Sequence, residues 1–124
     1  MIFVFGSNLR GVHGAGAAAY AVLHEGAVMG KGTGHYGNSY ALPTKDWRIQ
    51  TLPIADVRAF VELFMAYAEM RSDLEFKVTR IGCGLAGYKD KDIAPMFYKA
   101  PSNCVFDDAW KPWLGMQHRY WGTM

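Results

Sequence analysis

The sequence lacks the features that mark several large protein classes. It holds only two cysteines, Cys83 and Cys104, which is too few for a disulfide framework or a cysteine-rich metal site. No apolar run approaches the length of a transmembrane helix, and the apolar start at Met1–Phe5 is too short and lacks the basic residues of a signal peptide. We therefore expect a cytoplasmic protein whose cysteines stay reduced, without membrane contact, metal or other cofactor.

An excess of charge of one sign is also missing. The formal net charge is only +2, which is too small to indicate binding of nucleic acid or of a membrane through bulk charge, although it slightly favours a small anionic ligand. We find no internal repeat and no low-complexity linker. With 51% hydrophobic and 19% charged residues, the 124-residue chain has the composition of one compact globular domain.

Predicted strands and helices alternate along the chain. The predicted strands are Ile2–Phe5, buried on both faces, Ser39–Leu42, ended by Pro43, Leu74–Ile81 and Asn103–Phe106. The predicted helices are Ala17–Glu25, stopped by Gly26, Asp56–Met70 and Asp90–Phe97, whereas Gly26–Asn38 is predicted to be a loop. This alternation predicts an α/β fold with three layers, α/β/α, around a mostly parallel sheet.

Ligands of such folds bind beyond the carboxyl ends of the strands. Four segments are predicted to meet at that edge of the sheet, namely Asn8–Gly16, Pro43–Asp46, Gly82–Gly87 and Phe106–Asp108. Two of them are rich in glycine, which brings backbone N–H groups close to a ligand and favours phosphate. The alternative is that these are tight turns that only pack a helix on the sheet.

The second glycine-rich segment, Gly82–Gly87, also has the spacing G-x-G-x-x-G. Asp107 lies 20 residues beyond Gly87, where a Rossmann dinucleotide-binding fold has its acidic residue. This motif, with Asp107, indicates one candidate function, that of a dinucleotide-dependent oxidoreductase.

Three motifs in order resemble the macrodomain family. Asn8–Ala18 has the pattern N-x-x-G-x-x-G-x-G-x-A, which resembles the first ligand loop of the macrodomain subgroup that includes the terminal ADP-ribose glycohydrolase and the antitoxin that removes ADP-ribose from DNA. Ile81–Leu85 resembles the second loop of that subgroup, and Thr44–Lys45 resembles the end of the strand that carries its reactive lysine. The chain also resembles a small phage-encoded macro-like family, through Ser39–Asp46 and Ser102–Cys104.

The resemblance implies a role for particular residues. Asn8 would hydrogen-bond the distal ribose, and Lys45 would either attack the anomeric carbon of an ADP-ribosyl group or pair with phosphate. From the residues themselves, Phe106 is a candidate to stack on a base, with core packing as the alternative, and Asp107 or Asp108 is a candidate to bind an adenine amine or a ribose. The backbone of the two glycine loops would hold a diphosphate, with contacts from Gly11, Val12, His13, Gly14 and Gly16 in the first loop and from Gly82, Cys83, Gly84, Leu85, Ala86 and Gly87 in the second.

The sequence departs from the family pattern at two acidic positions. The acid that binds the adenine amine is absent, because the first strand begins at Ile2, and the acid that assists the lysine of the glycohydrolase falls at Ala86. The second departure favours binding over hydrolysis. We therefore expect residues 1–108 to form a macrodomain-like domain that binds ADP-ribose or a related NAD-derived nucleotide, free or attached to DNA or protein.

The sequence leaves two alternative functions open. An ADP-ribosyl hydrolase that uses Lys45 is the first alternative function, and the oxidoreductase is the second. Residues 109–124 form an aromatic tail that we expect to pack on the domain or to make a dimer contact. A phage origin would favour a protein that sequesters or destroys a nucleotide signal of the host.

Overall fold

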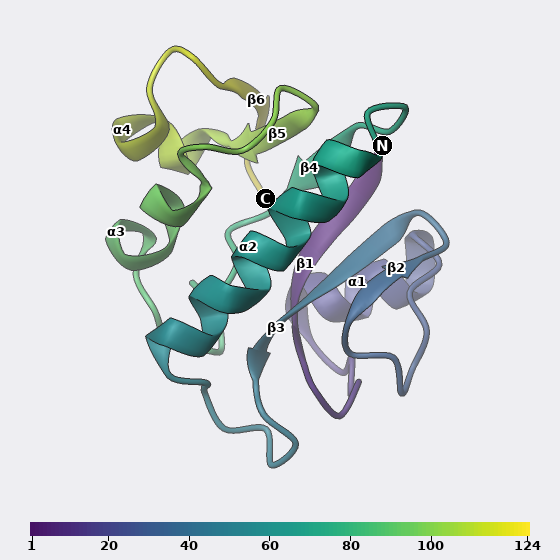
Figure 1. Ribbon diagram of the computed structural model, residues 1–124. Helices are drawn as coiled ribbons and strands as arrows, with labels where there is room; N and C mark the ends of the chain where they lie inside the picture. The colour runs from purple at the N-terminus through teal and green to yellow at the C-terminus, as the bar shows by residue number, and fades with distance from the viewer.

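A computed structural model describes all 124 residues of the chain and shows one six-stranded sheet in the order β2-β3-β1-β4-β5-β6 (Figure 1). The strands are β1 (Ile2–Asn8), β2 (Gly34–Tyr36), β3 (Ser39–Lys45), β4 (Phe76–Val78), β5 (Cys104–Asp107) and β6 (Arg119–Gly122). The α-helices are α1 (Gly16–His24), α2 (Ile54–Met70), α3 (Asp90–Ile93) and α4 (Lys111–Leu114), with 3₁₀ turns η1 (Ala94–Phe97) and η2 (Asp108–Trp110). The predicted α/β class with a mostly parallel sheet is confirmed.

Strand β1 is the centre of the sheet. It pairs in parallel with β3 on one side and with β4 on the other, and β4, β5 and β6 continue the parallel arrangement. Only β2 runs antiparallel, against β3. The carboxyl ends of five strands therefore lie at one edge of the sheet.

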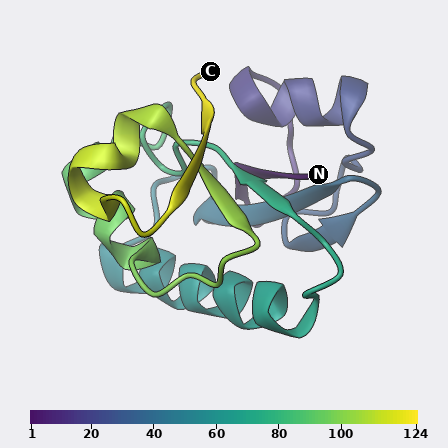
Figure 2. The same cartoon turned by 90° about the horizontal axis from the view of Figure 1, so that it is seen from above.

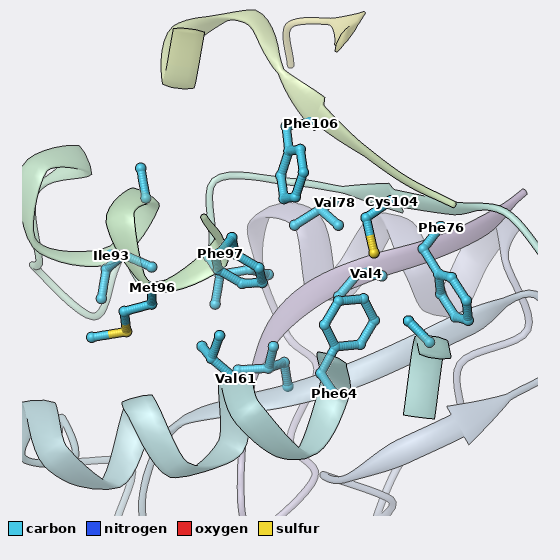
Figure 3. Close-up of a cluster of buried hydrophobic side chains, with 14 of the residues drawn as sticks. Val4, Val61, Phe64, Phe76, Val78, Ile93, Met96, Phe97, Cys104 and Phe106 are labelled. Atoms are coloured by element: carbon cyan, nitrogen blue, oxygen red, sulfur yellow. The ribbon is translucent and has the colours of Figure 1, made fainter. Parts of the chain in front are cut away.

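The helices lie on both faces of the sheet, as Figure 2 shows with α1 on one side and α2 on the other. On the α2 side, Val57, Val61, Phe64 and Ala68 are fully buried and recur at the spacing of one helical face. They belong to a cluster of 20 buried residues that joins α2 to the sheet, to η1 and to Trp110 (Figure 3).

The opposite side has a much smaller core. Phe3 and Phe5 point to this face and pack with Ala21, Ala27 and Ala41, while the partly buried Ala17, Ala18 and Val22 complete the contact. Because the α1 residues are mostly small, the helix packs closely on β1. All four residues Ile2–Phe5 are buried, which confirms that the first strand is covered on both faces.

Strand β3 is longer than predicted. It continues through Pro43 to Lys45, so the prediction that Pro43 ends the strand is wrong. The reason is that β2 pairs only with Ser39–Ala41, which leaves Pro43 with one neighbouring strand, β1, and no need to donate a hydrogen bond on the other side. The extension carries Lys45 to the edge where β1 ends.

Residues 109–124 are part of the domain structure. Trp110 is fully buried in the main core, and β6 extends the sheet beyond β5, held in addition by the indole N–H of Trp121, which donates to the carbonyl of Val78. None of the helices combines the length and the apolar character that crossing a membrane requires.

The loop before β2 packs directly under the end of β1. A Cβ atom on Gly32 would lie only 2.0 Å from the carbonyl oxygen of Asn8, and the Ser7 hydroxyl donates to the carbonyl of Gly32. The loop therefore supports the point at which β1 gives way to the first glycine loop.

We expect Gly32→Ala to lower the free energy of unfolding by roughly 1–3 kcal/mol, because the added methyl group overlaps rigid backbone. Gly14→Ala is the matched control, since Gly14 has an ordinary φ and no atom within 4 Å of the Cβ position. Urea denaturation followed by circular dichroism measures both. Equal stability of Gly32→Ala and the wild type would show that the loop does not pack as described.

Candidate functional site

A cavity of about 740 Å³ opens at the carboxyl ends of β1, β3, β4 and β5. It is more than twice the size of a second cavity beside Lys111 and Tyr120, of about 310 Å³, and a ligand of nucleotide size fits such a volume. Eleven of the residues predicted for the site line it, namely Asn8, Val12, Gly14, Gly16, Lys45, Gly82, Cys83, Gly84, Leu85, Ala86 and Asp107.

The first glycine loop is held in shape by Asn8. Its side-chain amide donates to the carbonyl of Val12 at 2.8 Å, and its side-chain oxygen accepts from the N–H of Val12 at 3.0 Å. The backbone carbonyl of Asn8 accepts from Gly11. Asn8 thus fixes the loop that leads from β1 into α1, whatever further contact it makes in the cavity.

Helix α1 begins at the wall of the cavity. Its N-cap residue, Ala15, offers no side-chain oxygen, and its first turn contains no acidic residue. The N–H groups of Gly16, Ala17 and Ala18, all on the cavity wall, have no hydrogen-bond partner within the protein. The amino-terminal end of α1, with the positive end of the helix dipole and three N–H groups without an internal partner, therefore lies on the cavity wall.

The second glycine turn presents a similar set of donors. Its shape is fixed by backbone hydrogen bonds from Cys83 to Arg80, from Gly87 to Gly84 and from Tyr88 to Gly82. The N–H groups of Gly84, Leu85 and Ala86, which line the cavity, make no hydrogen bond within the protein. Loops on two adjacent strands, β1 and β4, thus direct unpaired donors into one cavity.

Neither the backbone conformation nor the packing of the fold requires glycine at positions 14 and 84. Neither has a φ in the left-handed region, and neither has any atom within 4 Å of its Cβ position. Gly82 differs, since its φ of +76° requires glycine for the turn itself. The absence of side chains at Gly14 and Gly84 keeps the two walls of the cavity open.

Three charged side chains line the cavity. Lys45 is half-buried and forms no ion pair. Arg80 makes a forked ion pair with Asp90, at 2.9 and 2.6 Å. Asp107 is buried, and its carboxylate already accepts from the N–H of Ala109, from the Thr123 hydroxyl and from the N–H of Met124.

The Arg80–Asp90 pair anchors the second turn to the rest of the domain. The Arg80 guanidinium, aided by the indole N–H of Trp110 at 2.8 Å, holds the pKa of the Asp90 carboxyl below its usual value. Because Trp110 belongs to the main core, this network fixes the direction of Arg80 beside the cavity.

Cys83 does not have the properties of a nucleophile. Burial raises the pKa of its thiol to about 12, so almost no thiolate forms near neutral pH. No group of three or more histidine, cysteine, aspartate or glutamate side chains is placed to hold a metal ion.

Four residues predicted for the site lie away from the cavity wall: Gly11, His13, Gly87 and Phe106. Gly11 packs against the backbone of Gly30, and His13 is buried beside Phe5 with its ring Nε2 bonded to the carbonyl of Lys31. Phe106 is fully buried among Phe97, Trp110 and His118, where no base can stack on it. The buried side chains of His13 and Phe106 therefore belong to the structure around the cavity and not to its wall.

Sequence reasoning missed several residues of the cavity wall, among them Gly6, Ser7, Thr79, Arg80, Ile49 and Met124. The position of Arg80, directly before the second glycine turn, was a usable signal. No such signal exists in the sequence for Ile49 or Met124, because the position of Ile49 depends on an unusual turn and that of Met124 depends on the path of β6. Comparison with protein-family models, with curated proteins and with solved structures gives no match to this chain.

We expect Asp90→Asn to lower the melting temperature at pH 7, because Arg80 and Trp110 lose a charged acceptor. The pKa of Asp90 is lower in the folded than in the unfolded chain, so its stabilising effect is present above the unfolded value, near 3.8, and is lost as the pH falls. The melting temperatures of both proteins should therefore differ at pH 5 and above and converge as the pH falls below about 3.8.

Glu69→Gln is the control, because Glu69 is exposed on α2 and forms no ion pair. It should melt like the wild type at every pH. A constant difference between Asp90→Asn and the wild type from pH 7 to pH 3 would contradict the role given to the Asp90 charge.

Proposed function

We propose that this protein binds ADP-ribose or a related NAD-derived nucleotide in the cavity, as a reader or sequestering protein. The observation that carries the proposal is the pair of donor sets described above. The free N–H groups of α1 and those of Gly84–Ala86 meet around one cavity, an arrangement suited to the oxygens of a diphosphate. The proposal agrees with the family that the three sequence motifs resemble.

The order of the strands suits a ligand that has a central diphosphate and a further group on each side of it. Along the edge of the sheet the order is β3, β1, β4, β5, and the donors come from the loops that follow the two middle strands. A diphosphate held there would leave room on both sides, toward Lys45 after β3 and toward Asp107 at the end of β5. A dinucleotide-like molecule with a central diphosphate has this shape.

The charges of the cavity wall favour an anion. Lys45 has no acidic partner and gives the wall an uncompensated positive charge, whereas Arg80 is already paired with Asp90 and the Asp107 carboxylate already accepts three hydrogen bonds. An anionic ligand is therefore attracted by Lys45.

Hydrolysis by Lys45 is the second candidate. The lysine stands at the end of β3 on the cavity wall, as the resemblance implies for a nucleophile. However, Ala86 lines the cavity where the family's assisting acid would be, and Asp107 is engaged with its own chain. No carboxylate is free to act as a general acid, and this favours binding.

Two features weigh against the oxidoreductase. The turn Gly82–Gly87 leads into α3, a helix of only four residues, whereas a dinucleotide-binding motif opens a long helix. Asp107, the candidate ribose ligand, has its carboxylate bonded to Ala109, Thr123 and Met124. Both features favour a binding protein over an oxidoreductase.

We expect Gly14→Val and Gly84→Val each to weaken ADP-ribose binding at least tenfold, or about 1.4 kcal/mol, because the side chain would stand where the diphosphate approaches. Calorimetric titration measures the affinity, and circular dichroism checks the fold. Ala59→Val adds a comparable side chain on the exposed face of α2 and should bind like the wild type. Unchanged affinity in both folded glycine variants would refute the diphosphate site.

A ligand series tests the same proposal from the other side. ADP-ribose should bind more tightly than AMP, because only a diphosphate engages both sets of donors at once. The measurement is a calorimetric comparison of the two ligands on the wild-type protein. Equal affinities would mean that the two loops do not act together.

Lys45 variants separate the binding protein from the hydrolase. We expect no release of ADP-ribose from modified DNA or modified glutamate, and a loss of affinity of roughly 1.5–3 kcal/mol in Lys45→Ala, the worth of one charge-assisted contact. Lys45→Arg keeps the charge and should retain more of the binding. Turnover by the wild type that disappears in both variants, with borohydride trapping of the wild type, would instead establish a hydrolase.

A further inference from the structure

Ile49 is the one non-glycine residue of the chain in the left-handed region, with φ at 60°. For a β-branched residue this conformation is strained, and such residues persist only where the surroundings impose them. Here the surroundings do so. The N–H of Ile49 donates to the carbonyl of Asp46, the Asp46 carboxylate accepts from the N–H groups of Arg48 and Gln50, and the N–H of Asp46 donates to Gln50.

The strained side chain does not serve the core. Ile49 belongs to neither buried cluster and is absent from the partly buried residues packed against them. It lines the cavity instead, half-buried, four residues after Lys45. The turn that presents it is tied to the opposite wall, because the Thr51 hydroxyl donates to the carbonyl of Ala86 at 2.8 Å.

The course of the chain after β3 places Ile49 at one end of the cavity. The turn follows β3 directly after Lys45 and is tied through Thr51 to the second glycine turn, so Ile49 stands on the cavity wall at the Lys45 end. A ligand atom there belongs to the group attached to the far side of the diphosphate. An apolar, branched side chain suits the carbon face of a sugar ring and offers nothing to a bare phosphate.

We infer that Ile49 is a specificity residue that recognises the sugar attached beyond the diphosphate and so distinguishes ADP-ribose from ADP. The inference rests on the proposed function, since it assumes that the diphosphate occupies the donors of the two loops. The strained backbone then holds an apolar side chain in place beside Lys45. The neighbouring wall residues Thr44, Lys45 and Asn8 are polar.

The test compares the affinities of ADP-ribose and ADP by calorimetry in the wild type, Ile49→Gly and Ile49→Val. Glycine relieves the strain and removes the contact, whereas valine keeps both the β-branch and most of the apolar surface. We expect Ile49→Gly to lose at least tenfold in ADP-ribose affinity, with ADP affinity within threefold of the wild type. Ile49→Val should stay within threefold for both ligands.

Thermal melting accompanies the titrations. Because the strain disappears, Ile49→Gly should melt no lower than the wild type. Ile49→Asn provides a second variant if the glycine protein folds poorly, since asparagine tolerates the left-handed conformation, and it should show the same selective loss. An equal loss for both ligands, or no loss for either, would overturn the inference. Failure of the wild type to bind either ligand would overturn the proposed function itself, and the inference with it.

Discussion

The parallel pairing of β1 with both β3 and β4 is the constraint on which the rest of the structure depends. It buries Ile2–Phe5 on both faces, between the α2 core and the smaller α1 core, and it aligns the carboxyl ends of three neighbouring strands. The first glycine loop, Lys45 and the second glycine turn follow those three ends. A shift of β1 by one residue would exchange Val4 and Phe5 between two cores of very different size, so the register is strongly specified.

The sequence was most informative where a pattern is local. The apolar run Ile2–Phe5 and the helical spacing of Val57, Val61 and Phe64 predict their elements because one segment contains all the information. The glycine loops were predicted correctly as neighbours in space, because the carboxyl ends of parallel strands share one edge. Their membership of a particular family stays a prediction that rests on the motifs.

Prediction failed where a distant segment decides the structure. The last residues of β1 are polar, and their strand conformation depends on partners such as Thr44, whose hydroxyl donates to the carbonyl of Ser7. Pro43 stays in β3 because β2 is short, a fact that lies outside its own sequence. The role of Ile49 in the cavity wall could not be predicted for a related reason. An isoleucine in the sequence does not predict a left-handed backbone, because this conformation is imposed here by the hydrogen bonds of Asp46.

The path of β6 determines where anything joined to this domain would stand. Because β6 is parallel to β5, it carries the chain toward the cavity edge, and Met124 ends on the cavity wall. Met1 precedes the opposite end of β1, the end away from the cavity. A fusion partner attached after Met124 would emerge at the mouth of the cavity and obstruct it, whereas one attached before Met1 would leave the mouth free. For a tethered reporter or an immobilised sensor, the amino-terminal side is therefore the point of attachment.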